Sequence, residues 1–137
     1  MADRLSKRER SKVMSRVRNK DTRPELEVRS LLHRAGYRFR LHASEFPGSP
    51  DLVLPRYQTV LFVHGCFWHG HDCPRGGRPT SNTEFWNAKL DGNQKRDREV
   101  RQVLEEDGWA VVTVWECELR DPDSLLTRLT NFLDRRG

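Results

Sequence analysis

Residues 64–73, with the sequence HGCFWHGHDC, restrict the folds open to this chain of 137 residues. The stretch contains three of the five histidines and two of the three cysteines. It also begins a segment, residues 65–83, that contains Gly and Pro but has no hydrophobic periodicity. A loop of this length inside a small domain needs either a function or an internal cross-link. We therefore expect something other than regular secondary structure to fix this segment.

Cys66, His71 and Cys73, together with the distant Cys117, offer the ligands of a structural zinc site. Zinc in such sites takes four thiolate or imidazole ligands, and a Cys3His set satisfies that number. The ion would fasten the loop to the end of the strand that carries Cys117. Three small buried cysteines are the alternative, although two of them lie in a polar loop. The neighbouring histidines could replace His71, so the stretch holds more ligands than one zinc ion needs.

Hydrophobic patterns predict helices that alternate with strands. Helices are expected over residues 21–37, 81–109 and 121–136, and strands over residues 37–42, 51–54, 59–64 and 109–119. The segment TVLFV, residues 59–63, is almost wholly apolar, which is typical of a central strand buried on both faces. This order predicts an α/β domain in which a mixed central sheet is flanked by helices.

Two capping boxes are predicted at helix N-termini, Thr22 with Glu25 and Ser81 with Glu84. Gly36 is a natural stop for the first helix.

Basic residues are concentrated in the N-terminal part of the chain. Residues 1–40 contain 13 Lys and Arg against 5 Asp and Glu, whereas the whole chain has 25 against 20. This distribution favours a polyanionic partner, with a solvated tail as the alternative. We interpret residues 1–20 as a basic arm that orders on a partner, and residues 21–137 as a single domain.

Asp51 opens an apolar strand directly after Pro50. A hairpin that turns at residues 56–57 pairs residues whose numbers sum to roughly 113, by antiparallel geometry. This register places Asp51 opposite residue 62 or 63 and beside His64. A carboxylate together with a backbone carbonyl suits Mg²⁺, and Glu25 could add a second carboxylate. The alternatives are a turn residue for Asp51, a capping role for Glu25 and ordinary surface or core histidines.

Phe67 and Trp68 lie between potential metal ligands, and Trp86 lies on the following helix. Apolar side chains on a rigid loop of a basic protein are candidate wedges between base pairs, with packing around the zinc as the alternative. Lys89 and Asn93 share a helix face with Trp86. These two polar residues could read base edges or could be solvated.

Three segments together resemble the very-short-patch (Vsr) repair endonucleases. They are NKDTRPELEVRSLLHRAGYRFRLH, FPGSPDLVLPRYQTVLFVHGCFWHGHDC and FWNAKLDGNQKRD, and WECEL fits as well. The resemblance extends from about residue 6 to residue 135. It implies a restriction-endonuclease-like core with a structural zinc loop. It also implies nicking of one DNA strand 5′ to the thymine of a T·G mismatch, which arises when 5-methylcytosine deaminates.

The resemblance implies a role for each candidate catalytic residue. Asp51 and the carbonyl oxygen of Val63 bind the catalytic Mg²⁺. Glu25 and His64 support the water ligands of that ion, and His69 acts as the general base or orients the attacking water. In the wider superfamily a lysine follows on the next strand. Here LFVHG places His64 at that point, as expected within the Vsr family.

The remaining implied roles concern zinc and DNA. The zinc ligands are Cys66, His71, Cys73 and Cys117. The residues that intercalate beside the mismatch are Phe67, Trp68 and Trp86. The mismatched pair is contacted by Lys89 and Asn93, and Met14 with the N-terminal arm approaches from the other groove.

The implied substrate is double-stranded DNA with a T·G mismatch, and the implied partners are mismatch-repair proteins and a DNA cytosine methyltransferase. We expect a protein of the bacterial cytoplasm, associated with the nucleoid when bound to DNA, because the chain lacks a signal-peptide core and a long apolar run. The resemblance implies a monomer. A zinc-stabilised DNA-binding module without catalysis is the alternative, but a binder has no need of Asp51, Glu25 and His69 together. A nuclease that has lost mismatch specificity is another.

Overall fold

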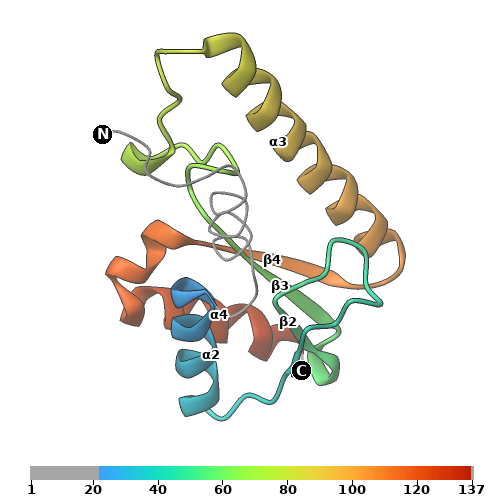
Figure 1. The fold of residues 1–137 in the computed structure, drawn as a ribbon. Coiled ribbons are helices and arrows are strands. Elements are labelled where there is room, and N and C mark those ends of the chain that lie inside the picture. Colours follow the sequence, from blue (N-terminus) through green and yellow to red (C-terminus); the bar gives the residue numbers. More distant parts are fainter. Residues whose placement is uncertain (1–21, 137) are drawn as a thin grey trace, which may run out of the picture.

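The computed structural model describes residues 22–136, so the basic arm and Met14 lie outside the described residues. The helices are α2 (Arg23–Arg34), α3 (Thr83–Glu106) and α4 (Pro122–Arg136). The strands are β1 (Arg40–Leu41), β2 (Leu52–Leu54), β3 (Thr59–His64) and β4 (Ala110–Trp115). Short 3-10 helices are η1 (Pro55–Tyr57), η2 (Pro74–Gly76) and η3 (Glu116–Arg120). The predicted α/β architecture, a mixed sheet flanked by helices, is confirmed (Figure 1).

The four strands form one sheet in the order β1-β2-β3-β4. β2 and β3 form the predicted hairpin, and their pairs Leu52–Leu61 and Val53–Val60 have numbers that sum to 113, as the sequence predicts. β3 and β4 are parallel, and α3 lies between them in the chain. This topology places the ends of β3 and β4, at His64 and Trp115, side by side.

The sheet is buried on both faces because alternate strand residues point to opposite sides. On one face, Leu52, Leu61 and Val112 pack with the apolar sides of α2 and α4. On the other face, Val60 and Val111 pack with Leu104 of α3. Figure 1 shows this arrangement, with α2 and α4 on one side of the sheet and α3 on the other. The near-continuous apolar runs of β3 and β4 follow from this double burial.

Both predicted capping boxes are wrong. Thr22 and Asn82 occupy the N-cap positions of α2 and α3, and neither makes a side-chain capping hydrogen bond. Glu25 turns away from the cap, and Arg29 donates a hydrogen bond to it at 3.3 Å. Gly36 does end the helix region, with φ at +90°, and the amide of Tyr37 bonds to the carbonyl of Leu32 at 3.0 Å.

Two predicted strands are shorter than expected. The strand predicted over residues 37–42 forms ladder pairs only at Arg40 and Leu41, because its partner β2 is itself three residues long. The strand predicted over residues 109–119 ends at Trp115, and the chain turns into η3. Cys117 therefore lies in a turn just beyond β4, which brings its side chain back toward the end of β3.

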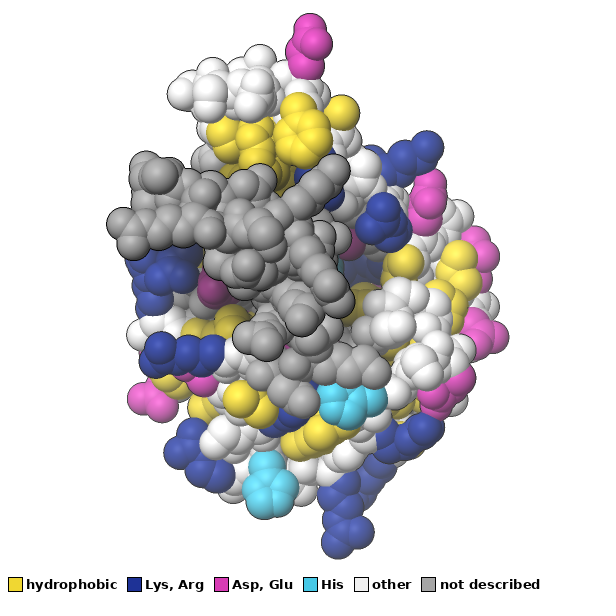
Figure 2. Space-filling model, in the orientation of Figure 1, with side chains coloured by type: hydrophobic (Ala, Val, Ile, Leu, Met, Phe, Trp, Pro, Cys, Tyr) yellow, Lys and Arg dark blue, Asp and Glu magenta, His cyan; other side chains and the backbone are white. Residues whose placement is uncertain are grey.

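Surface side chains differ along α3 (Figure 2). Hydrophobic side chains gather near the N-terminal end of this helix, and Lys and Arg side chains lie along the surface that it forms. Phe85, near this end, is 60% exposed. Within residues 22–136, no helix has the length and apolar character needed to cross a membrane.

Candidate active site

The ligand atoms of Cys66, His71, Cys73 and Cys117 all lie within 4.8 Å of one another. Ligands about 2.3 Å from a central zinc ion, placed tetrahedrally, are separated by about 3.8 Å, so this cluster fits such an ion. Nδ1 of His71 lies 3.5 Å from Sγ of Cys117, and the amide of Cys117 points at Sγ of Cys66 from 3.4 Å. His64 and His69 are not members of this cluster, so His71 is the histidine that lies with the three cysteines.

The thiols of the cluster have different electrostatic surroundings. Burial is the largest influence on Cys66, and together with the neighbouring Cys117 and Cys73 thiols it raises the pKa of Cys66 to about 12. At Cys73 burial also acts to raise the pKa, but hydrogen bonds from His71, Cys66 and two backbone amides prevail and lower it to about 7. A bound cation would favour the thiolate form of each residue. Trp115 stacks on His71 with ring centroids 4.1 Å apart and orients that ligand.

Asp51 occupies the predicted position at the start of β2. Its amide bonds to the carbonyl of Leu61 at 3.0 Å, and the amide of Val63 donates to its Oδ2 at 2.6 Å. The structure therefore places the N–H of Val63 against Asp51. Glu25, 8% exposed, approaches Asp51 from the first turn of α2. Burial is the main cause that raises the pKa of Asp51 to about 7, and the charge of Glu25 adds to it, against the Val63 hydrogen bond and Arg29.

His64 and His69 lie beside Asp97, a residue that the sequence patterns do not single out. Nδ1 of His69 is 2.6 Å from Oδ2 of Asp97, and the His64 and His69 rings stack with centroids 3.7 Å apart. Burial and then the neighbouring His69 lower the pKa of His64 to about 4, against the attraction of Asp97. His64 is therefore neutral at pH 7. Among the described residues none hydrogen-bonds its buried Nδ1.

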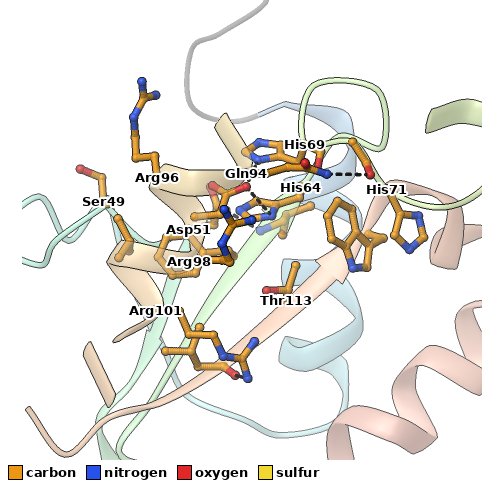
Figure 3. Close-up of a pocket in the computed structure, with 18 of the residues that line it drawn as sticks. Ser49, Asp51, His64, His69, His71, Gln94, Arg96, Arg98, Arg101 and Thr113 are labelled. Carbon is orange, nitrogen blue, oxygen red and sulfur yellow. Dashed lines mark hydrogen bonds and ion pairs between the residues drawn. The ribbon is translucent and has the colours of Figure 1, made fainter. Parts of the chain in front are cut away.

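These groups line one cavity of about 630 Å³ between the end of the sheet and α3. Asp51, His64, His69 and Asp97 all contribute to its wall, and Figure 3 shows Asp51, His64 and His69 converging on it. Glu25 lies behind Asp51 and is not part of this wall. The arrangement combines a carboxylate site suited to a divalent cation with a histidine–aspartate pair suited to proton transfer.

Side chains from α3 hold the loop that carries His69. Asn93 donates to the carbonyl of Trp68 at 2.8 Å, and Gln94 donates to the carbonyls of Gly70 at 3.1 Å and His69 at 3.4 Å. Arg78, further along the same loop, bonds to Asp91 of α3 at 2.6 Å. Asn93, predicted to face the mismatched base pair, thus has its amide nitrogen engaged within the fold. The loop is therefore held by α3 as well as by its contacts in the Cys/His cluster.

The three predicted wedge residues form one aromatic cluster. Phe67 lies 5.1 Å from Trp68 and 5.4 Å from Trp86, and the two tryptophan rings are 5.9 Å apart. Each ring packs against the others and remains partly exposed. Lys89, half-buried, follows Trp86 by three residues on α3. The cluster and the cavity therefore lie along the same helix.

Sequence reasoning missed Asp97, although a signal for it exists. Trp86 and Asn93 define one face of α3, and four residues further along that face the chain reaches Asp97. Extending the predicted DNA-facing stripe by one helical turn would have found this carboxylate.

Comparisons with known proteins agree with this geometry. A profile of the family described as DNA mismatch endonuclease Vsr matches residues 2–75. The chain is similar to Type II nicking enzyme V.XorIIP of Xanthomonas oryzae pv. oryzae, with 52% identity over 98% of both chains. It is 44% identical to DNA mismatch endonuclease Vsr of Escherichia coli over 91% of this chain and 80% of that protein. Type II nicking enzyme V.NmeAIP of Neisseria meningitidis is 42% identical, over 97% of this chain and 95% of the relative.

Proposed function

This chain belongs to the Vsr family of DNA mismatch endonucleases and is a strand-nicking DNA hydrolase, and we propose that it nicks one strand 5′ to the thymine of a T·G mismatch. The observation that carries this proposal is the convergence of Asp51 with the His69–Asp97 pair in one cavity. The substrate is double-stranded DNA, the reaction needs Mg²⁺, and the domain over residues 21–137 acts as a monomer.

Asp51 and the carbonyl oxygen of Val63 would hold the catalytic Mg²⁺, with Glu25 and His64 supporting its water ligands. Two carboxylates that approach each other in a buried place fit a divalent cation, and the buried Nδ1 of His64, which has no hydrogen bond from the described residues, fits a water molecule. When bound, Mg²⁺ polarises the scissile phosphate and stabilises the charge of the transition state.

His69 is the general base in this proposal. Because Asp97 accepts a hydrogen bond from Nδ1, the other ring nitrogen is left unprotonated and able to take a proton from the attacking water. The oxygen of that water forms a bond to phosphorus while the bond to one sugar oxygen breaks, and this sugar oxygen takes a proton from solvent and leaves as the hydroxyl of one new strand end. Asp97 stabilises the imidazolium that forms, and the neutral His64 ring stacked on His69 adds no opposing charge.

Phe67, Trp68 and Trp86 are proposed to enter the DNA beside the mismatch. Separating stacked bases costs a few kcal/mol, and a mismatched step costs less to open than a matched one. The zinc site, with Asn93 and Gln94, holds this wedge in register with the catalytic groups. We propose that Lys89 and Asn93 contact the mismatched base pair. Asn93 binds the carbonyl of Trp68 through its amide nitrogen, and its Oδ1 takes no part in that bond.

The test is a nicking assay with Mg²⁺ on paired T·G and T·A duplexes of otherwise identical sequence. The expected result is a single nick 5′ to the mismatched thymine and no cut in the T·A duplex. Equal nicking of both duplexes would show that the protein nicks DNA without recognising the mismatch. Binding without a nick would favour the alternative of a DNA-binding module without catalysis. Because relatives carry the name Type II nicking enzyme, the same assay on a library of flanking sequences identifies the preferred context.

A further inference from the structure

Arginine side chains supply the positive charge around the active-site cavity. The cavity is lined by the carboxylates Asp51, Asp72 and Asp97, and by the guanidinium groups of Arg96, Arg98 and Arg101. A DNA phosphate that approaches three carboxylates is repelled unless cations at the same site offset their charge. The arginines are therefore candidates for contacts with the DNA backbone.

Arg101 is already engaged within the protein. Its Nη2 bonds to the carbonyl of Val111 at 3.3 Å, and its Nε lies 3.5 Å from the carboxylate of Glu105. Arg96 and Arg98 differ, because neither makes an ion pair or a side-chain hydrogen bond with any residue in the described part of the chain. Both side chains are exposed, so their guanidinium groups are available to a ligand.

Arg96 and Arg98 flank Asp97 on α3. Successive helix residues are about 100° apart, so the two arginines leave the helix on opposite sides of the carboxylate that holds His69. In Figure 3 the side chain of Arg96 extends outward, while Arg98 is drawn in the middle of the view near Asp51 and His64. Arg96 also continues the stripe of Lys89 and Asn93 on α3, at a spacing of i, i+4 and i+7.

We propose that Arg96 and Arg98 form a phosphate clamp that holds the nicked strand on the two sides of Asp97 and so positions the scissile phosphate between Asp51 and His69. A guanidinium group suits this task because its planar donors can bind two phosphate oxygens at once. The inference rests on the proposed function and adds two binding residues to the same site.

The salt dependence of binding measures the clamp directly. Binding of a T·G duplex, without added Mg²⁺, is measured over a range of salt concentrations for Arg96→Ala, Arg98→Ala and the control Arg135→Ala. Arg135 is exposed on α4, across the sheet from the cavity. The slope of log K against log[salt] should become shallower by about 1 for each clamp variant and should stay unchanged for the control. Slopes equal to that of the parent protein in both clamp variants would overturn the proposal.

Neutral phosphate analogues locate each contact. A duplex series carries one methylphosphonate at each position around the nick, and each duplex is tested with the parent protein and both variants. A methylphosphonate at one position should weaken binding of the parent protein but should have little further effect on binding of Arg96→Ala. A methylphosphonate at a different position should have the same pattern of effects for Arg98→Ala. Arg96→Lys and Arg98→Lys should recover the salt slope. If the losses of binding caused by the methylphosphonate and by the arginine substitution add at every position, the clamp is overturned, even if the parent protein nicks T·G DNA. Failure of the parent protein to nick T·G DNA would instead count against the proposed function. The salt slopes would still show whether Arg96 and Arg98 contact phosphates, because they measure binding and not nicking.

Discussion

Nδ1 of His69 lies 2.6 Å from Oδ2 of Asp97, although the two residues are 28 positions apart in the chain and belong to a loop and a helix. The contact exists because Asn93 and Gln94, on the preceding turn of the same helix, hold the backbone of that loop. One helix therefore fixes both the base and the carboxylate that orients it.

Asp97→Asn should reduce the rate of nicking by roughly 10²–10⁴-fold, the range of a general acid–base contribution. The amide can donate to Nδ1 of His69 and so favour the wrong tautomer. Single-turnover nicking checks this, alongside the DNA affinity, which should change little. Glu99→Gln, an exposed carboxylate on the same helix, serves as the control and should nick at the parent rate. A rate within threefold of the parent for Asp97→Asn would exclude the assigned role.

Asp51→Ala should abolish nicking and retain DNA binding, because the carboxylate is needed to hold the metal, while its bond to the Val63 amide is only one of those that join β2 to β3. Because the pKa of Asp51 is raised to about 7, the metal-free folded protein loses stability as the pH rises from about 4 to about 7, and the loss is complete above about pH 7. Removing this carboxylate should therefore make the thermal unfolding temperature of the metal-free protein fall less between about pH 4 and pH 7 than that of the parent. Loss of DNA binding, or near-normal nicking, would contradict the prediction.

The pH dependence of the magnesium requirement follows from the same residue. With a pKa of about 7, the Asp51 carboxyl is protonated below that pH and protons compete with Mg²⁺. The Mg²⁺ concentration for half-maximal nicking should rise by up to about tenfold for each pH unit below about 7. Titrations of Mg²⁺ at several pH values measure this shift. A half-saturating concentration that is constant between pH 5.5 and 7 would count against Asp51 as the ligand.

Removal of the proposed zinc ion should inactivate the enzyme, although none of its four ligands has a step in the proposed reaction and only His71 lines the cavity. His71→Ala should lose bound zinc, unfold at a lower temperature and nick poorly, because the loop that carries His69 and the aromatic cluster loses an anchor. Elemental analysis of the purified protein and a thermal melt test this. His33→Ala, an exposed histidine of α2, should keep the parent's zinc content. Full zinc content in His71→Ala would show that this ligand set is wrong.

Two glycine substitutions separate loop geometry from helix propensity. Gly70 has φ at +63°, and a Cβ at this position would collide with the Gln94 side chain that binds the carbonyls of residues 69 and 70. Gly70→Ala should therefore cost roughly 1–2 kcal/mol of stability and lower the nicking rate. Gly92, inside α3, has open space around it.

Gly92→Ala should raise stability by about 0.5–1 kcal/mol with unchanged nicking. Denaturant unfolding and the nicking assay measure both variants. Equal effects from the two substitutions would mean that the contact with Gln94 does not position His69.

The Cys/His cluster and the hairpin register could be predicted because each depends on local spacing or on a simple geometric rule. Cys66, His71 and Cys73 are close in the chain, and Cys117 was the only cysteine left to complete the set. The register that places Asp51 opposite Phe62 follows once the turn is located. The capping box predicted at Glu25 is wrong because the Glu25 carboxylate interacts with Arg29 and Asp51 instead of with the N-terminus of α2.

The sequence by itself determined the order of the elements, the two-sided burial of β3 and β4, and the residue types of the two proposed metal sites, because these depend on periodicity and on ligand chemistry. Only the tertiary structure decided which groups meet in the cavity. Asp97 pairs with His69, and its sequence neighbours Arg96 and Arg98 line the same cavity, because α3 crosses the end of the parallel strands. The crossing of a helix over a sheet depends on packing between distant residues, and no local pattern in the chain records it.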